Sequence, residues 1–195
     1  MFTGIIEEVG IVKDITKEKG NLVISIEASF TSKLKLNESL SHNGACLSVI
    51  PFTKKQYRVM AVQETLNRTS LKHLKKGDKI NLERSMVANG RIDGHFVLGH
   101  VDATVKCKSV KKLEGSHVFT FSISKGDRKY IVQKGSIAIN GVSLTIASVT
   151  ADTFSVAIIP YTFKHTNFQD IKAGSEANIE FDVLGKYVIE NLPKK

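Results

Sequence analysis

The sequence has little of several residue types whose abundance would indicate particular protein classes. It contains two cysteines, three prolines and no tryptophan among 195 residues. Cys46 and Cys107 are too few for the disulfide framework of a small secreted domain, so we expect a reducing, cytoplasmic compartment. No apolar run approaches the roughly 20 residues that cross a bilayer, and the N-terminus lacks the pattern of a signal peptide. We therefore expect a soluble globular protein without a membrane partner.

Positive charge is in excess, which could indicate nucleic-acid binding. The formal net charge is +9 at pH 7. The lysines are scattered along the chain, however, with no basic stripe interleaved with aromatic residues and no zinc or helix-turn-helix spacing. We interpret the charge as a solvated surface and expect no nucleic-acid partner.

The chain repeats itself at a nearly constant offset. Residues 39–49, SLSHNGACLSV, align with residues 136–146, SIAINGVSLTI, at a shift of 136 − 39 = 97. The same shift pairs identical residues further along: Thr65 with Thr162, Thr69 with Thr166, Gly77 with Gly174, Asn81 with Asn178, and Glu83 with Glu180. A weaker match at a shift of 95 sets residues 2–6 against residues 97–101. The chain is therefore a duplication.

Short strands dominate each copy. β-branched and aromatic residues, in places alternating with polar ones, predict strands over Leu22–Ala28, Tyr57–Val62, His117–Ile123 and Thr153–Ile159. Asn-Gly dipeptides at 43–44 and 140–141 predict tight hairpin turns. Helical stretches are expected only over Thr65–Leu74, Thr162–Ile171 and the tail Val183–Asn191. About six short strands per copy suit a closed barrel, which leaves no free sheet edge.

We therefore predict an all-β protein made of two tandem homologous six-stranded β-barrels and a short C-terminal helix. The expected boundaries are residues 1–88 for the first barrel, 89–182 for the second and 183–195 for the helix and tail.

Five motifs resemble the riboflavin synthase family in order and spacing. They are MFTGI at residues 1–5, HNGACL at 42–47, GHFVLGHVD at 94–102, KGSIAINGVSLTI at 134–146 and IPYTF at 159–163. The resemblance covers nearly the whole chain. It implies two Greek-key barrels related by a pseudo-twofold axis, and a homotrimer whose active site lies between subunits. It also allows association with lumazine synthase.

The resemblance further implies a transferase reaction, the last step of riboflavin biosynthesis. Two molecules of 6,7-dimethyl-8-ribityllumazine would yield riboflavin and 5-amino-6-(D-ribitylamino)uracil, with no metal and no redox cofactor. The duplication suits this dismutation, because two homologous pockets can hold two copies of one ligand in register.

Four residues match the family's catalytic positions. Cys46 offers a thiolate that can add to an electrophilic ring carbon, unless it is only a small buried hydrophobe. His100 suits removal of a proton from a ring methyl, although His95 in the same motif could compete. Ser39 would hydrogen-bond the reacting system, or only begin a strand. Phe2 would stack on a flat heterocycle, or only pack in a core.

By family position, each barrel would contribute one substrate pocket. The first pocket would use Gly4, Ile5, Ile6, Cys46, Leu47, Ser48, Met60, Ala61, Val62, Gln63, Glu64 and Thr65. The second would use Gly99, His100, Val101, Lys134, Ser143, Leu144, Thr145, Ala157, Ile158, Ile159, Pro160, Tyr161 and Thr162. Cys46 and His100 are thus expected in different pockets. A competent site would bring these together from one chain or from two, and the resemblance favours a neighbouring chain.

Two rival functions use similar barrels. A lumazine protein binds the ligand without turning it over, but it has lost parts of the catalytic set that is complete here. The flavin-binding barrel of reductases precedes a nucleotide-binding α/β domain, for which 195 residues leave no room.

Overall fold

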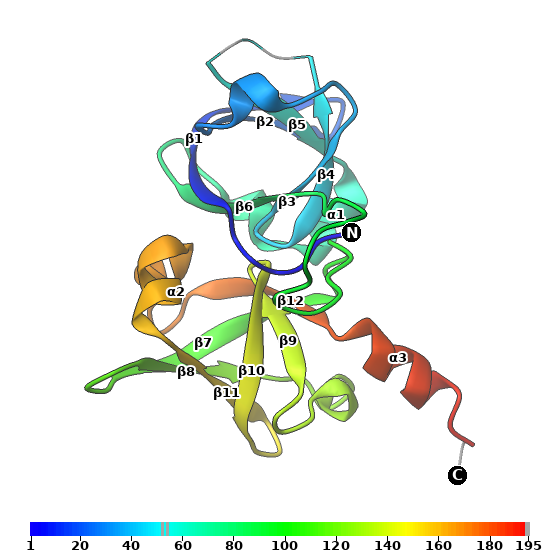
Figure 1. The fold of residues 1–195 in the computed structure, drawn as a ribbon, viewed down its shortest axis with the longest axis vertical. Helices are drawn as coiled ribbons and strands as arrows, with labels where there is room; N and C mark the ends of the chain where they lie inside the picture. The colour runs from blue at the N-terminus through cyan, green and yellow to red at the C-terminus, as the bar shows by residue number, and fades with distance from the viewer. Residues whose placement is uncertain (52, 54, 194–195) are drawn as a thin grey trace.

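The computed structural model describes residues 1–51, 53 and 55–193. Lys194 and Lys195, at the end of the expected tail, lie outside the described residues. The chain forms two β-barrels, one above the other in Figure 1, and a helix that extends from the second barrel. Within the described part, no helix is both long enough and apolar enough to cross a membrane.

The first barrel closes in the strand order β1-β2-β5-β4-β3-β6, with all neighbours antiparallel. Its strands are β1 (Glu8–Glu18), β2 (Asn21–Glu27), β3 (Ser39–His42), β4 (Ala45–Ile50), β5 (Tyr57–Ala61) and β6 (Lys79–Arg84). Short helices lie between strands: η1 (Thr31–Lys33), α1 (Gln63–Arg68) and η2 (Ser70–His73). Because β5 returns to lie beside β2 after the β3-β4-β5 meander, the topology is a Greek key.

The second barrel repeats this order as β7-β8-β11-β10-β9-β12. Its strands are β7 (Ala103–Lys112), β8 (His117–Ser122), β9 (Ser136–Ile139), β10 (Val142–Val149), β11 (Thr153–Ile158) and β12 (Glu176–Phe181). The helices are η3 (Arg128–Tyr130), α2 (Pro160–His165), η4 (Asn167–Asp170) and α3 (Val183–Glu190). The predicted duplicated all-β fold with a C-terminal helix is confirmed.

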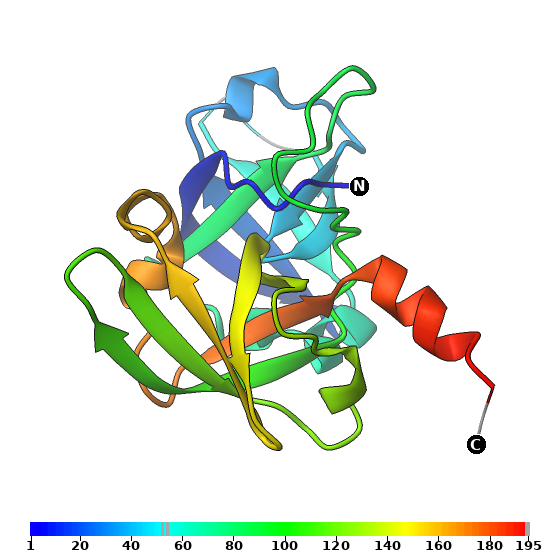
Figure 2. The same cartoon turned by 60° about the horizontal axis from the view of Figure 1, so that its bottom comes forward.

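The Asn-Gly dipeptides form the predicted hairpin turns. Asn43 and Gly44 have φ values of 46° and 82°, and Asn140 and Gly141 have 46° and 78°. Two successive residues with positive φ make the turn whose twist matches that of paired strands, and asparagine and glycine tolerate this conformation best. The two turns meet at the junction of the barrels, which Figure 2 shows from a second direction.

The predicted helices over 65–74 and 162–171 are each broken into two pieces. Thr69 separates α1 from η2 with an extended backbone, φ −122° and ψ 160°, and its hydroxyl accepts a hydrogen bond from Leu71 N. Thr166 separates α2 from η4 in the same way, with its hydroxyl accepting from Phe168 N. A threonine that caps a new turn directs the backbone out of the preceding helix, and helical periodicity alone does not reveal this.

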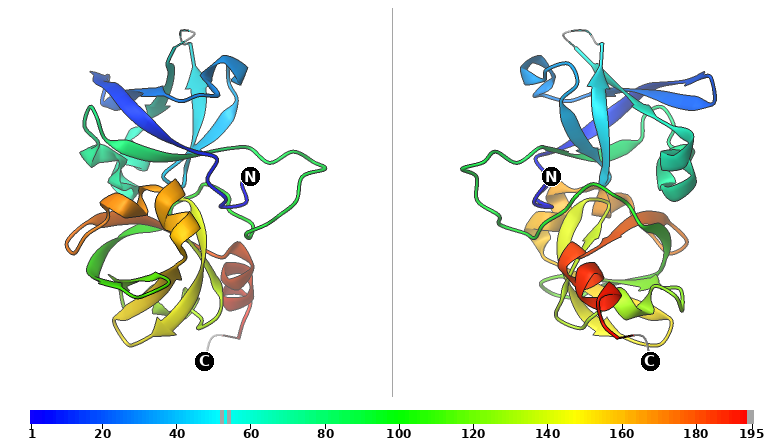
Figure 3. Two further views of the ribbon diagram at one scale, coloured as in Figure 1. Left: turned by 60° about the vertical axis from the view of Figure 1, so that its left-hand side comes forward. Right: turned by 90° about the vertical axis from the view of Figure 1, so that its right-hand side faces the viewer.

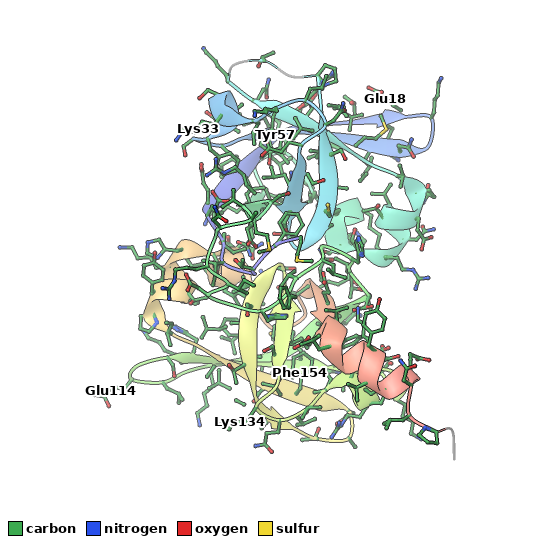
Figure 4. All side chains as sticks on the ribbon, turned by 45° about the vertical axis from the view of Figure 1, so that its right-hand side comes forward. Glu18, Lys33, Tyr57, Glu114, Lys134 and Phe154 are labelled. Atoms are coloured by element: carbon green, nitrogen blue, oxygen red, sulfur yellow. The ribbon has the colours of Figure 1, made fainter. Side chains whose placement is uncertain are left out.

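Each barrel has its own apolar core, but the first contains a polar pair. His42 Nδ1 lies 3.0 Å from Leu40 O and Nε2 lies 2.9 Å from the Tyr57 hydroxyl, and both side chains are fully buried. Because a carbonyl only accepts, Nδ1 donates to Leu40 and Nε2 accepts from Tyr57. Burial lowers the pKa of His42 to about 3. The equivalent positions of the second barrel hold Ile139 and Phe154; Figure 4 labels Tyr57 and Phe154.

We expect this pair to make the protein sensitive to acid. The unfolded chain binds a proton at His42 below the ordinary pKa of 6.5, whereas the folded chain binds it only near pH 3. The free energy of unfolding therefore decreases as pH falls from about 6.5 towards 3, and His42 contributes about 1.4 kcal/mol of this decrease per pH unit. Urea unfolding at a series of pH values checks this. The variant His42→Ile with Tyr57→Phe, which copies the second barrel, should lose that part of the pH dependence; an unchanged slope would contradict the assignment.

Candidate functional site

Cys46 lies on the outer wall of the first barrel. In the β3-β4 pair, Leu40 is opposite Leu47 and both side chains belong to the barrel core. Side chains alternate along a strand, so the neighbouring pairs, Ser41 with Cys46 and Ser39 with Ser48, face outward. The predicted site residues Ser39, Cys46 and Ser48 thus share one outer face, whereas the Leu47 side chain points into the core and only its backbone can contact a ligand.

The segment that precedes the first strand of each barrel crosses to the other barrel. Gly99 O accepts a hydrogen bond of 2.9 Å from Cys46 N, and Gly4 O accepts one of 2.8 Å from Ser143 N. Between the barrels, residues 85–102 form an excursion that passes beside the N-terminus in Figure 3. Residues 2–6, which precede the first barrel, therefore contact the second barrel, and residues 97–101, which precede the second barrel, contact the first.

The exchange corrects the expected division of the substrate residues. Val101 packs against the core of the first barrel, and Ile6 packs against the core of the second. The residues 99–101 therefore belong with Cys46, and the residues 4–6 belong with Ser143. The expectation that Cys46 and His100 occupy different pockets was wrong. The segment that carries His100 precedes the second barrel in the sequence but covers the first, and the sequence does not reveal such a crossing.

Cys46 and His100 line one cavity of about 440 Å³ on the first barrel. The remaining lining residues come from β4, α1 with its following threonine, and the crossing segment: Ala45, Glu64, Thr65, Arg68, Thr69, Gly99, Val101 and Asp102. Cys46 is half-buried and His100 is exposed. The cavity thus combines a thiol, an imidazole and the Glu64–Arg68 ion pair, whose charged atoms are 3.0 Å apart. The volume of the cavity lies within the range of small-molecule sites.

Two buried glutamates hold the crossing segments in place. The Glu180 carboxylate accepts hydrogen bonds from the backbone N–H groups of Leu98 (2.6 Å), Gly99 (2.9 Å) and His100 (2.9 Å). Burial raises the pKa of the Glu180 carboxyl, an effect opposed by these hydrogen bonds. The carboxylate fixes the backbone from which His100 projects into the cavity.

The equivalent Glu83 holds the N-terminal segment. It accepts hydrogen bonds from Thr3 N (2.6 Å), Thr3 Oγ1 (2.8 Å) and Gly4 N (3.0 Å). Burial again raises the pKa of this carboxyl. The identity of Glu83 and Glu180 across the repeat was the sequence signal for these anchors, but only their backbone partners reveal the role.

Phe2 is fully buried between the barrels. It packs with Val97 and Ala138, and Cys46 lies against the same cluster. Its backbone also pairs with Val97. A ring with no exposed face cannot stack on a bound heterocycle, so the structure favours the packing alternative over the stacking role.

A second histidine lies beside the second barrel, although the repeat equivalent of His100 is Ile5. His95 Nδ1 is 2.7 Å from the Ser143 hydroxyl, and Ser143 is the repeat partner of Cys46. Burial lowers the pKa of His95, so this imidazole is neutral near pH 7. Its Nε2 is buried without a hydrogen-bond partner among the described residues. His95 therefore lies beside Ser143 on the second barrel, whereas His100 lies in the cavity with Cys46 on the first.

The other expected substrate residues vary in exposure. Those with exposed side chains are Ile5, Val62, Gln63, Thr145, Ala157, Ile159, Pro160 and Tyr161. Half-buried ones are Met60, Leu144 and Thr162, whereas Ala61 and Ile158 are fully buried. Lys134 is exposed and lies at the end of the second barrel that is remote from the first (Figure 4). The structure thus does not bring Lys134 to the junction.

Comparison with known proteins identifies the family. Residues 3–85 and 98–182 each match the family model described as lumazine binding domain. The chain is 42% identical over 195 residues to riboflavin synthase of Bacillus subtilis (strain 168), covering 100% of this chain and 91% of that protein.

The chain belongs to the riboflavin synthase family.

More distant relatives agree in length and fold. Riboflavin synthase of Schizosaccharomyces pombe is 38% identical over 192 residues, with 96% of this chain and 91% of that protein covered. The crystal structure of LumP complexed with riboflavin has a TM-score of 0.87 at 22% identity, covering 93% of this chain and 99% of that one. LumP complexed with 6,7-dimethyl-8-(1'-D-ribityl) lumazine gives 0.84 at 23% identity. At these identities, the LumP structures show that the fold is shared.

Proposed function

We propose that the protein is a riboflavin synthase, a transferase that converts two molecules of 6,7-dimethyl-8-ribityllumazine into riboflavin and 5-amino-6-(D-ribitylamino)uracil. The observation that carries the proposal is that Cys46 and His100 line one cavity in a chain that resembles riboflavin synthases along its whole length. The reaction is a dismutation, in which one substrate gives the four carbons that the other receives. It therefore requires neither a metal nor a redox cofactor.

The cavity supplies two chemical groups for this reaction. His100 is the base that removes a proton from a ring methyl, because its imidazole is exposed to the cavity and its backbone is fixed by Glu180. Cys46 is the nucleophile that adds to the electrophilic ring or holds it in a polarised state. Ser39, on the same outer face, is a candidate hydrogen-bond donor.

The second substrate molecule would bind on the second barrel. Gly4 with Ser143, and Thr162 as the repeat partner of Thr65, provide the equivalent backbone and hydroxyl groups. The Ser143 hydroxyl and Ile5 replace the thiol and the imidazole there. One pocket is therefore equipped for proton and thiol chemistry, and the other mainly for binding.

We infer that the protein assembles as a homotrimer in which the first barrel of one chain faces the second barrel of the next. Four apolar side chains on and just after α3 are at least 58% exposed: Leu184, Tyr187, Val188 and Leu192. Exposed apolar side chains gathered on one short element favour burial against another subunit. The free thiols of Cys46 and Cys107 suit the expected cytoplasmic location. Association with lumazine synthase stays a prediction.

The test of the proposed function uses purified protein alone. Mixed with 6,7-dimethyl-8-ribityllumazine and no metal or nicotinamide, it should form one riboflavin for every two lumazines consumed, followed by absorbance and chromatography. Tight lumazine binding without riboflavin formation would instead identify a binding protein of the LumP type.

Glu180→Gln should lower this activity by about 10–100-fold, because displacing a catalytic group by roughly 1 Å can reduce the rate by that factor. The amide replaces one acceptor oxygen with a donor that faces backbone N–H groups, so the segment carrying His100 moves. Circular dichroism should show an unchanged strand content. Glu83→Gln is the matched control: it disturbs the segment beside Ser143 and should affect substrate binding more than turnover. Equal turnover in wild-type and Glu180→Gln proteins would refute the positioning role.

A further inference from the structure

The N-terminal crossing segment ends at Glu7, which is fixed to the last strand of the first barrel. Glu7 N donates a hydrogen bond of 2.9 Å to Leu82 O, and the Glu7 carboxylate accepts one of 2.7 Å from Arg84 N. The Arg84 guanidinium supplies the countercharge, with Nε at 2.9 Å and Nη2 at 2.7 Å from Glu7 Oε2. One residue of β6 thus donates a backbone hydrogen to the carboxylate and balances its charge.

The second crossing segment ends at Asp102, the counterpart of Glu7 at the shift of 95 residues. Asp102 N donates to Ile179 O at 2.9 Å, and the Asp102 carboxylate accepts from Phe181 N at 2.9 Å. These two partners on β12 are each 97 residues after the corresponding partner of Glu7 on β6. The backbone part of the anchor is therefore repeated in the second barrel.

The countercharge of this second anchor comes from a different element. Phe181 stands where the first barrel has Arg84, and its buried ring stacks on Tyr130 at a centroid distance of 5.2 Å. The cation is Lys186 on α3, whose Nζ lies 2.8 Å from Asp102 Oδ1 and 2.6 Å from Oδ2. The helix therefore replaces a strand arginine as the source of the positive charge.

α3 makes few contacts with the barrel from which it extends (Figure 1). All of its residues are described, and none of their side chains is fully buried. Lys186 and Asp102 are 25% and 29% exposed, so this ion pair is partly shielded from solvent. A second, more exposed attachment lies near the end of the helix, where Glu190 Oε1 is 3.7 Å from Lys129 Nζ and 3.3 Å from the Tyr130 hydroxyl. Only the first attachment reaches the crossing segment.

The Lys186 anchor borders the cavity. Asp102 follows His100 by two residues and lines the cavity with His100 and Cys46. Lys186 also acts on the second carboxylate that holds this segment. Burial raises the pKa of the Glu180 carboxyl, and the backbone hydrogen bonds and the positive charge of Lys186 oppose that rise. A cation at this place therefore supports both carboxylates that hold the crossing segment.

We propose that Lys186 is a positioning residue for the cavity: by balancing the charge of Asp102, it fixes the end of the segment that carries His100 and covers Cys46. This role rests on the proposed function, in which His100 is the base and Cys46 the nucleophile. Without Lys186, the Asp102 carboxylate keeps one backbone donor but loses its countercharge, and a partly buried carboxylate in that state turns towards water. α3 is then part of the site as well as an apolar surface for another subunit.

The test compares two substitutions of Lys186 in the full chain. Lys186→Met keeps the apolar stem without the charge and should lower kcat for riboflavin formation by about tenfold, less than the roughly 100-fold that a 1 Å displacement can cost. KM should change by less than about threefold, because the anchor holds the base rather than the ligand. Lys186→Arg restores the charge and should keep kcat within about threefold of the wild-type value.

Two further variants separate the anchor from general docking of α3. Lys129→Met removes the cation beside Glu190 without touching Asp102, so kcat should stay within about twofold of the wild-type value. Asp102→Asn should lower kcat about as much as Lys186→Met does, and combining the two should cost less than about threefold more, because residues that act through one contact are not additive. Asp102→Asn also reaches the anchor if Lys186→Met does not fold.

A second measurement does not depend on turnover. Gly99 lies against the Cys46 side chain, and Gly99 O accepts from Cys46 N, so the crossing segment covers this half-buried thiol. Loosening the segment in Lys186→Met should raise the rate at which a thiol reagent modifies Cys46 by about threefold or more. Mass spectrometry of the peptide that contains Cys46 follows the reaction. Lys129→Met should react at the wild-type rate.

The two measurements separate the role of Lys186 from the proposed function. If the wild-type protein forms no riboflavin, the proposed function fails and the thiol rates alone decide whether Lys186 holds the segment. In an active protein, an unchanged kcat or an unchanged thiol rate in Lys186→Met would overturn the positioning role. A loss of kcat in Lys129→Met as large as in Lys186→Met, or a Lys186→Arg protein as slow as Lys186→Met, would overturn it as well.

Discussion

His100→Gln protein is expected to form riboflavin about 10²–10⁴ times more slowly than wild-type protein, the usual cost of losing a positioned acid–base group. His100 is exposed and is held through its backbone N–H to Glu180, so the substitution should leave the fold and melting temperature unchanged. Steady-state kinetics should show the loss in kcat rather than in KM, because glutamine preserves the size and polarity of the side chain but not its basicity.

His95→Gln is the matched control for this variant. His95 belongs to the same motif but lies on the second barrel against Ser143, not in the cavity with Cys46. We expect a smaller loss that falls mainly on substrate binding. A greater loss of kcat in His95→Gln than in His100→Gln would reverse the assignment of the base.

Mixing inactive variants is expected to give recovery for one pair and none for another. Cys46→Ala and His100→Ala damage the same cavity, since both residues line it within one chain. Every first barrel in a hybrid trimer then lacks one of the two groups, whichever chain it comes from. Proteins unfolded and refolded together should therefore remain as inactive as their parents.

Cys46→Ala mixed with the double variant Ser143→Ala, Thr162→Ala should behave differently. If the site forms between neighbouring chains, an intact first barrel meets an intact second barrel at about a quarter of the junctions of a 1:1 mixture. Activity should recover towards that fraction, with mass spectrometry confirming hybrid trimers. Recovery in the first pair, or its absence in the second, would contradict the shared cavity or the inter-subunit site respectively.

The sequence by itself determined the duplication, the strands and the turns. The offset of 97 residues, the β-branched segments and the two Asn-Gly dipeptides depend on local preferences and on self-similarity, and both can be read along one chain. The motifs that contain Cys46 and His100 were recognised through their resemblance to the family. The breaks in the predicted helices at Thr69 and Thr166 became clear only from the backbone angles and capping hydrogen bonds of these threonines.

The tertiary structure alone decided which residues share a site. Alternation along β4 predicts that Cys46 faces away from Leu47, but not what covers the outer wall of the barrel. The covering segment, which carries His100, lies more than fifty residues away and is held by Glu180, eighty residues further on. The sequence likewise left stacking and core packing open for Phe2, and its burial between the barrels favours packing. Contacts of this kind depend on how two closed barrels pack against each other, which no local sequence pattern encodes. This packing places the Cys46 thiol and the His100 imidazole in one cavity.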